Sequence, residues 1–154
     1  FVLGEVSMHR LRSACSDHGE PHLVPRTPAR VLRGLMNGKI DLVFEHAGRF
    51  HVLDYKSNRL GDRLSDYAPA RLARAMDEHH YRFQALLYTV AVDRYLRQRM
   101  PRYRRDTDLG EAIYLFVRAT GMASGLGIWA HRFDDALIAA VERVFADPAH
   151  AEVA

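Results

Sequence analysis

The sequence predicts one mixed α/β domain spanning residues 1–154. Three observations predict it. Two strand-like runs, 40–44 and 50–55, flank a short polar turn, apolar residues recur at three- and four-residue spacing between 80 and 99, and residues 112–117 form an uninterrupted apolar run. With 48% hydrophobic and 27% charged residues, the chain has the ordinary balance of a protein that encloses one core.

The other elements follow from turn and capping residues. Alternation predicts a first strand over 1–8, and the Asp-, Gly-, Pro- and His-rich stretch 13–28 is expected to be a surface connection. Pro69 lies where a proline in the first turn would start a helix, Pro101 would end the next helix, and Asp134 is a good N-cap for the last one. Together these signals place helices at 69–78, 80–99 and 134–145, and a last strand at 128–133.

Composition narrows the functional class only slightly. The net charge of +3 is too small to identify a nucleic-acid-binding protein. Arginine outnumbers lysine strongly, since only Lys39 and Lys56 are lysines among 22 basic residues. The single Cys15 excludes a disulfide framework or a four-cysteine metal site within the chain and favours a reduced, cytoplasmic setting. No apolar run approaches the roughly 18 residues of a membrane span, and no signal pattern opens the sequence.

The hairpin predicted over 40–56 carries acidic residues in otherwise apolar strands. If its turn is centred between Ala47 and Gly48, Asp41 lies opposite Asp54. Opposed carboxylates repel each other unless a cation lies between them, and Mg²⁺ prefers such oxygen ligands. Lys56 shares the face of Asp54 because side chains alternate along a strand.

Two acids and an amine on one surface suit metal-assisted hydrolysis of a phosphodiester. Lys56 would orient the attacking water or stabilise the charge of the transition state. An aspartate two residues before a lysine also occurs in proteins without any catalytic role, and a bulge at Gly48 would shift the register. The interruption of two apolar strands by acids, beside one of only two lysines, favours the catalytic interpretation.

Three stretches of the sequence resemble the RecB-type nuclease domain of the PD-(D/E)xK superfamily. They are Gly38-Lys39-Ile40-Asp41, then Val52-Leu53-Asp54-Tyr55-Lys56-Ser57-Asn58, then the segment from Tyr81 to Tyr88 that contains Gln84. The resemblance runs from about Leu35 to Arg118 and more loosely to the final helix. It implies a restriction-endonuclease-like fold, with a mixed central sheet flanked by helices.

The resemblance also implies roles for individual residues. Asp41 and Asp54 would be metal ligands, with the main-chain carbonyl of Tyr55 as a third, and Lys56 the catalytic lysine. Gln84 and Tyr88 match a Q-x-x-x-Y motif and share a helix face that would support the site or touch DNA. A tyrosine on an apolar helix is more often a core aromatic, and this is the alternative interpretation of Tyr88.

This family has a further metal-binding histidine on a helix upstream of the hairpin. His9, His18 and His22 lie in sequence that looks strand- or loop-like. We therefore expect that the first helix of the fold precedes Phe1 and that the chain is the C-terminal part of a nuclease domain.

The resemblance implies an Mg²⁺-dependent deoxyribonuclease, with Mn²⁺ or Ca²⁺ as substitute ions. Its substrates would be single- and double-stranded DNA ends in bacterial recombinational repair. Helicase domains upstream in the same polypeptide and RecC- and RecD-like subunits are the implied partners, and the bacterial cytoplasm at the nucleoid is the implied location. The alternatives are a catalytically silent nuclease-like module that binds DNA or partner subunits, and a small basic domain unrelated to nucleases.

Two further features have open interpretations. His79 and His80 are adjacent and point to different sides of a helix, which favours a helix border over a metal site. The arginines between residues 94 and 105, interleaved with Tyr95 and Tyr103, would contact phosphates or simply form a solvated helix end. No G-x-x-x-x-G-K-[ST] motif is present, so ATP-driven unwinding does not reside in these residues.

Overall fold

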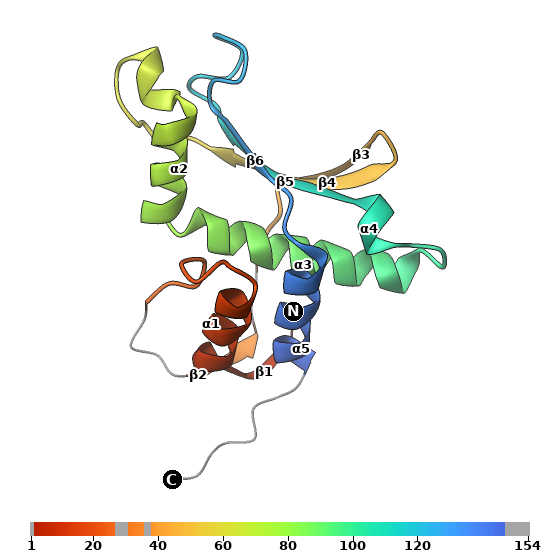
Figure 1. Ribbon diagram of the computed structural model, residues 1–154. Helices are drawn as coiled ribbons and strands as arrows, with labels where there is room; N and C mark the ends of the chain where they lie inside the picture. Colours follow the sequence, from red (N-terminus) through yellow and green to blue (C-terminus); the bar gives the residue numbers. More distant parts are fainter. Residues whose placement is uncertain (1, 27–30, 36–37, 147–154) are drawn as a thin grey trace. The chain divides into compact units, whose positions relative to one another are not determined.

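The described chain forms two compact units. The computed structural model describes residues 2–26, 31–35 and 38–146 (Figure 1). One unit comprises residues 1–39 and 134–154, and the other comprises residues 40–133. No helix in the described ranges is both long and apolar enough to cross a membrane.

The unit of residues 40–133 contains a four-stranded mixed sheet. Its strands are β3 (Leu42–His46), β4 (Arg49–Lys56), β5 (Leu109–Phe116) and β6 (Ile128–His131), side by side in that order. β4 pairs with β5 in parallel, and the two outer pairs are antiparallel. The mixed α/β prediction is confirmed. The four strands predicted in this unit are present, with bounds that differ from the predicted ones by up to three residues, and Asp41 lies just before β3 rather than within it.

Helices between β4 and β5 cover one face of this sheet. The 3₁₀ helix η1 (Leu64–Tyr67) leads into α2 (Pro69–Glu78), and α3 (Tyr81–Arg99) follows. α2 contacts β6, while α3 contacts β4 and β5 (Figure 1). Alternate residues Val52, Asp54 and Lys56 of β4 are buried on the helix-covered face. A parallel pair needs such a crossover connection.

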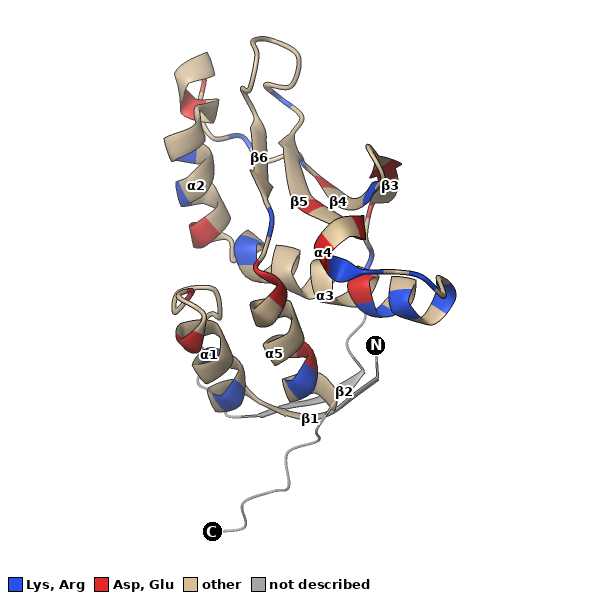
Figure 2. Ribbon diagram, turned by 45° about the vertical axis from the view of Figure 1, so that its right-hand side comes forward, with Lys and Arg blue, Asp and Glu red and all other residues tan. Residues whose placement is uncertain are grey.

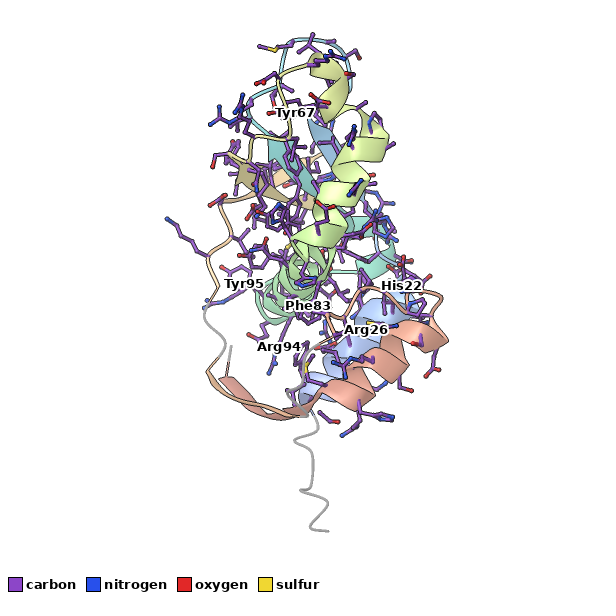
Figure 3. The ribbon with its side chains drawn as sticks, turned by 90° about the vertical axis from the view of Figure 1, so that its left-hand side faces the viewer. His22, Arg26, Tyr67, Phe83, Arg94 and Tyr95 are labelled. Carbon is purple, nitrogen blue, oxygen red and sulfur yellow. The ribbon has the colours of Figure 1, made fainter. Side chains whose placement is uncertain are left out.

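Local sequence signals explain where these elements begin and end. Pro69 occupies the start of α2 as predicted, and α3 ends just before Pro101. The adjacent histidines mark the border between the two helices: His79 is the C-cap of α2, and His80 takes a left-handed conformation with φ of 56°. Tyr67 (Figure 3) fixes the loop before α2, because its hydroxyl accepts a hydrogen bond from the Leu60 amide at 3.2 Å.

Asp93, on α3, is a fully buried acid that fixes the following segment to this helix. Its carboxylate accepts two hydrogen bonds from Arg105 at 2.8 and 2.9 Å, one from Arg97 at 3.1 Å and one from the Tyr103 hydroxyl at 2.9 Å. Arg105 begins the short helix α4 (Arg105–Asp108), and Figure 2 shows acidic and basic residues gathered there and along the end of α3. Two of the arginines offered as phosphate contacts are therefore partners of Asp93.

The other unit is small. β1 (Val2–Ser7) pairs antiparallel with β2 (Val31–Leu35), and α1 (Met8–Asp17) packs on α5 (Asp135–Ala146). Its described buried side chains come mainly from the two helices: Val6, Met8, Leu11, Cys15, Leu137, Ile138, Val141, Val144 and Phe145. Asp134 caps α5 as predicted, because its carboxylate accepts the Ala136 and Leu137 amides.

The expected surface connection over residues 13–28 is wrong in its first part. Residues 8–17 form α1, with the Ser7 hydroxyl accepting the Arg10 amide as its N-cap. His9 lies in this helix rather than in strand- or loop-like structure, whereas His18 is the C-cap residue in the turn that follows it. Met8, Leu11 and Cys15 are buried along one side of the helix, and this short apolar stripe outweighs the polar composition.

Candidate active site

The β3–β4 hairpin has the predicted register. Leu42 pairs with Leu53 and His46 with Arg49, so the turn is centred between Ala47 and Gly48. Both turn residues have positive φ, 50° and 76°, which is the signature of a two-residue type I′ turn. No bulge shifts the strands.

The two acids lie at the open end of this hairpin. Asp41 directly precedes β3, and its Oδ2 atom accepts a hydrogen bond from the Tyr55 amide at 3.0 Å. Asp54 lies in β4 and is only 5% exposed. Burial raises the pKa of Asp54, the hydrogen bond and charge of Lys56 oppose this rise, and the charge of Asp41 adds to it.

Lys56 is buried beside Asp54 on the helix-covered face. Its Nζ atom lies 2.6 Å from Oδ2 of Asp54 and donates a hydrogen bond to Oε1 of Gln84 at 2.9 Å. Tyr55, between the two, points to the opposite face, where its side chain is 50% exposed. Strand alternation therefore separates the tyrosine from the acid and the amine, as the sequence predicts.

Gln84 connects Lys56 to two tyrosines. Its Oε1 atom also accepts the Tyr114 hydroxyl at 3.1 Å, and its Nε2 atom donates to the Tyr88 hydroxyl at 3.1 Å. Burial, followed by the nearby charge of Asp54, raises the pKa of both tyrosines. Each phenol therefore stays protonated at neutral pH.

The fold brings the residues singled out in the sequence into one place. Asp54, Lys56, Gln84 and Tyr88 form a continuous chain of polar contacts. Asp41 joins it through the main chain of Tyr55.

The sequence prediction gave no individual role to three residues at the site: Asn58, Tyr81 and Tyr114. Asn58 and Tyr81 do lie in the stretches that resemble the nuclease domain. Tyr81 precedes Gln84 by three residues on α3, a spacing that places both on one helix face and could have indicated it. Tyr114 pairs with Asp54 across the parallel strands, and no local pattern reveals that neighbour.

The donors at the site fit a divalent cation that keeps several waters. The carboxylate of Asp54 is buried and is acted on by the negative charge of Asp41, a combination that a cation relieves. Mg²⁺ is commonly bound through one or two carboxylates together with waters and substrate phosphates. Within the described residues, no group of three or more His, Cys, Asp or Glu side chains is placed to hold a metal ion.

Comparison with known families agrees with this geometry. The model of the PD-(D/E)XK nuclease superfamily matches residues 8–152. The chain belongs to the PD-(D/E)XK nuclease superfamily. Its four-stranded mixed sheet flanked by helices is consistent with the restriction-endonuclease-like fold of this superfamily, and an origin unrelated to nucleases is excluded.

Known relatives place the chain more closely within the superfamily. It is 44% identical to the RecBCD enzyme subunit RecB of Escherichia coli over 75% of the chain, and 40% identical to that of Haemophilus influenzae over 74%. The Mycobacterium tuberculosis H37Rv subunit is 48% identical over 56% of the chain. The chain spans about a tenth of the length of these curated relatives and is a RecB-type PD-(D/E)XK domain.

Proposed function

We propose that this chain is a metal-dependent deoxyribonuclease that hydrolyses phosphodiester bonds of DNA. The observation that carries the proposal is the position of Lys56, whose ammonium group touches both Asp54 and Gln84 within a PD-(D/E)XK domain. A buried lysine in contact with an acid that is also close to a second acid suits metal-assisted hydrolysis of a phosphodiester.

Asp41 and Asp54, with the main-chain carbonyl of Tyr55, would hold Mg²⁺, and Mn²⁺ or Ca²⁺ would compete for the same oxygens. A divalent ion bound there supplies Lewis-acid polarisation of the phosphate and acidification of a water. Lys56 would place its positive charge beside the phosphorus-bound oxygens, where negative charge develops. Gln84 holds the ammonium group of Lys56 in place, and Tyr88 holds the Gln84 amide.

We further infer the setting of this activity from the relatives. Their name, RecBCD enzyme subunit RecB, supports a role for the chain in a helicase–nuclease that degrades single- and double-stranded DNA ends during recombinational repair. Helicase domains in the same polypeptide and RecC- and RecD-like subunits are then its partners.

The test is degradation of linear DNA by the full-length protein that contains this chain. With Mg²⁺ present, Asp54→Ala and Lys56→Ala should abolish cleavage while DNA binding, measured without metal, stays within about twofold, because both side chains are buried and are a small part of the surface that faces DNA. Lys39→Ala removes the other, exposed lysine and should leave cleavage unchanged. Chelation of the metal with EDTA should stop cleavage by the wild type.

Either of two results would overturn the proposal. Cleavage that persists in both Asp54→Ala and Lys56→Ala would show that other residues carry out the hydrolysis. Cleavage that survives complete metal removal would refute metal dependence.

A further inference from the structure

Two tyrosine rings enclose the ammonium group of Lys56. Its Nζ atom lies 3.9 Å from the centroid of the Tyr81 ring and 4.9 Å from that of Tyr114. The two rings are themselves 6.0 Å apart and tilted by 34°. We call these two rings the aromatic cage.

We propose that Tyr81, together with Tyr114, is a positioning residue that holds the Lys56 ammonium group for catalysis through its ring face. This inference rests on the proposed nuclease function and adds to it a residue outside the Q-x-x-x-Y motif. A cation over an aromatic ring is attracted by the negative face of the ring, most strongly where water is excluded. Lys56 is only 9% exposed, so the attraction acts in such a place.

The cage matters because its attraction for Lys56 does not depend on Asp54. In the described structure the ion pair with Asp54 holds the ammonium group from one side. A carboxylate that also binds a divalent cation attracts a neighbouring ammonium less strongly, since part of its charge is neutralised. The Lys56 ammonium group also contacts uncharged partners, which are the Oε1 atom of Gln84 and the two tyrosine rings.

The Tyr81 ring is itself held in position. It begins α3, its hydroxyl donates a hydrogen bond to Oδ1 of Asn58 at 3.1 Å, and it stacks on the His79 ring at 5.2 Å. Asn58 follows Lys56 by two residues, so the segment directly after the strand that carries the lysine anchors the ring that covers it. These contacts hold the ring face toward the ammonium group, and the helix position and the His79 stacking remain when the hydroxyl is removed.

The experiment compares ring removal with ring retention in the full-length protein. Tyr81→Leu removes the ring, Tyr81→Phe keeps the ring face and loses only the hydroxyl, and Tyr95→Leu removes an exposed tyrosine of the same helix as a matched control. Two assays are used. One measures kcat and KM on linear DNA with Mg²⁺, and the other measures the metal-free rate of Lys56 acetylation by peptide mass spectrometry with Lys39 as internal reference.

Tyr81→Leu should lower kcat by about tenfold with KM within about twofold, because the loss of a desolvated cation–π contact misplaces the amine rather than the substrate. Its Lys56 should acetylate several-fold faster, because the ring that covers the amine is gone. Tyr81→Phe and Tyr95→Leu should both stay within about twofold of wild type. Should Tyr81→Leu fail to fold, as seen by circular dichroism, Tyr81→Met serves as the ring-free variant.

The outcomes separate this inference from the proposed function. If Lys56→Ala is inactive but ring-free variants keep wild-type kcat, the inference is wrong and the nuclease function stands. If Tyr81→Phe loses as much kcat as Tyr81→Leu, the hydroxyl rather than the ring matters, and the inference is also wrong. If Lys56→Ala still cleaves DNA, the proposed function itself fails.

Discussion

Replacement of Asp93 by alanine should destabilise the unit of residues 40–133 strongly. The Asp93 side chain is fully buried and accepts hydrogen bonds from three residues, two of them cationic. Removing it takes away the carboxylate that the guanidinium group of Arg105, which is only 18% exposed, contacts at 2.8 Å. Breaking a buried ion pair in this way is costly because the remaining charge stays desolvated and has lost that attraction.

The size of the effect follows from how exposed each partner is. Loss of one member of a buried pair costs about 3–5 kcal/mol. Arg97 is 41% exposed and recovers much of its hydration, so we expect the lower end, about 3 kcal/mol. For a chain of this size that corresponds to a fall in Tm of roughly 6–12 °C.

Urea and thermal unfolding followed by circular dichroism measure this loss. Asp106→Ala is the matched control, because Asp106 forms an ion pair with Arg104 in which both side chains are more than half exposed. It should leave the free energy of unfolding unchanged within error. A loss below about 1 kcal/mol for Asp93→Ala would refute the view that this buried carboxylate anchors the segment after α3.

Three further results are expected. Burial raises the pKa of Asp93, but the hydrogen bonds of Arg105 and Tyr103 and the charges around Asp93 lower it by more. The stabilising contribution of Asp93 is therefore complete above about pH 4 and is lost as the pH falls through the folded-state pKa of Asp93. Acid titration of unfolding should be steeper for wild type than for Asp93→Asn. In the hairpin turn, Gly48→Ala should lower the free energy of unfolding by about 1 kcal/mol, whereas Ala47→Gly should not lower it, because both positions have positive φ; equal losses in urea unfolding would contradict this. Arg118 lies beside the end of β4 that carries Lys56, because its Nε atom donates a hydrogen bond to the Ser57 carbonyl. Arg118→Ala should weaken DNA binding and reduce the salt dependence of binding by about one counterion in fluorescence titrations. An unchanged slope of log affinity against log salt concentration would exclude a phosphate contact.

The hairpin was predictable because its signals are local. Two apolar runs and a two-residue turn with glycine determine the register, which ends with Leu42 opposite Leu53. Asp41 and Asp54 are the next residues beyond this pair, and the charge of Asp41 acts on Asp54. Strand alternation then puts Lys56 beside Asp54 without any knowledge of the rest of the fold. The roles assigned to these residues remain predictions that the mutants above test.

Other features depend on contacts that no local pattern contains. Tyr114 reaches Gln84 only because β5 pairs with β4 in parallel, after a crossover of two helices. Similarly, the arginines after residue 93 have a spacing that suits either phosphates or a helix end. The structure pairs Arg97 and Arg105 with Asp93, a partner that sequence spacing alone does not select.

Because β4 and β5 pair in parallel but lie far apart in the sequence, their pairing can form only after most of the unit has been synthesised. A ribosome completes Asp54, Lys56 and Gln84 well before it reaches Tyr114, so a nascent chain carries these candidate site residues before the strand that pairs beside them exists. Non-local parallel pairing is slow to form because the crossover must close first. The site therefore becomes rigid late, and an incompletely made chain holds its acids and its lysine without the geometry that aligns them.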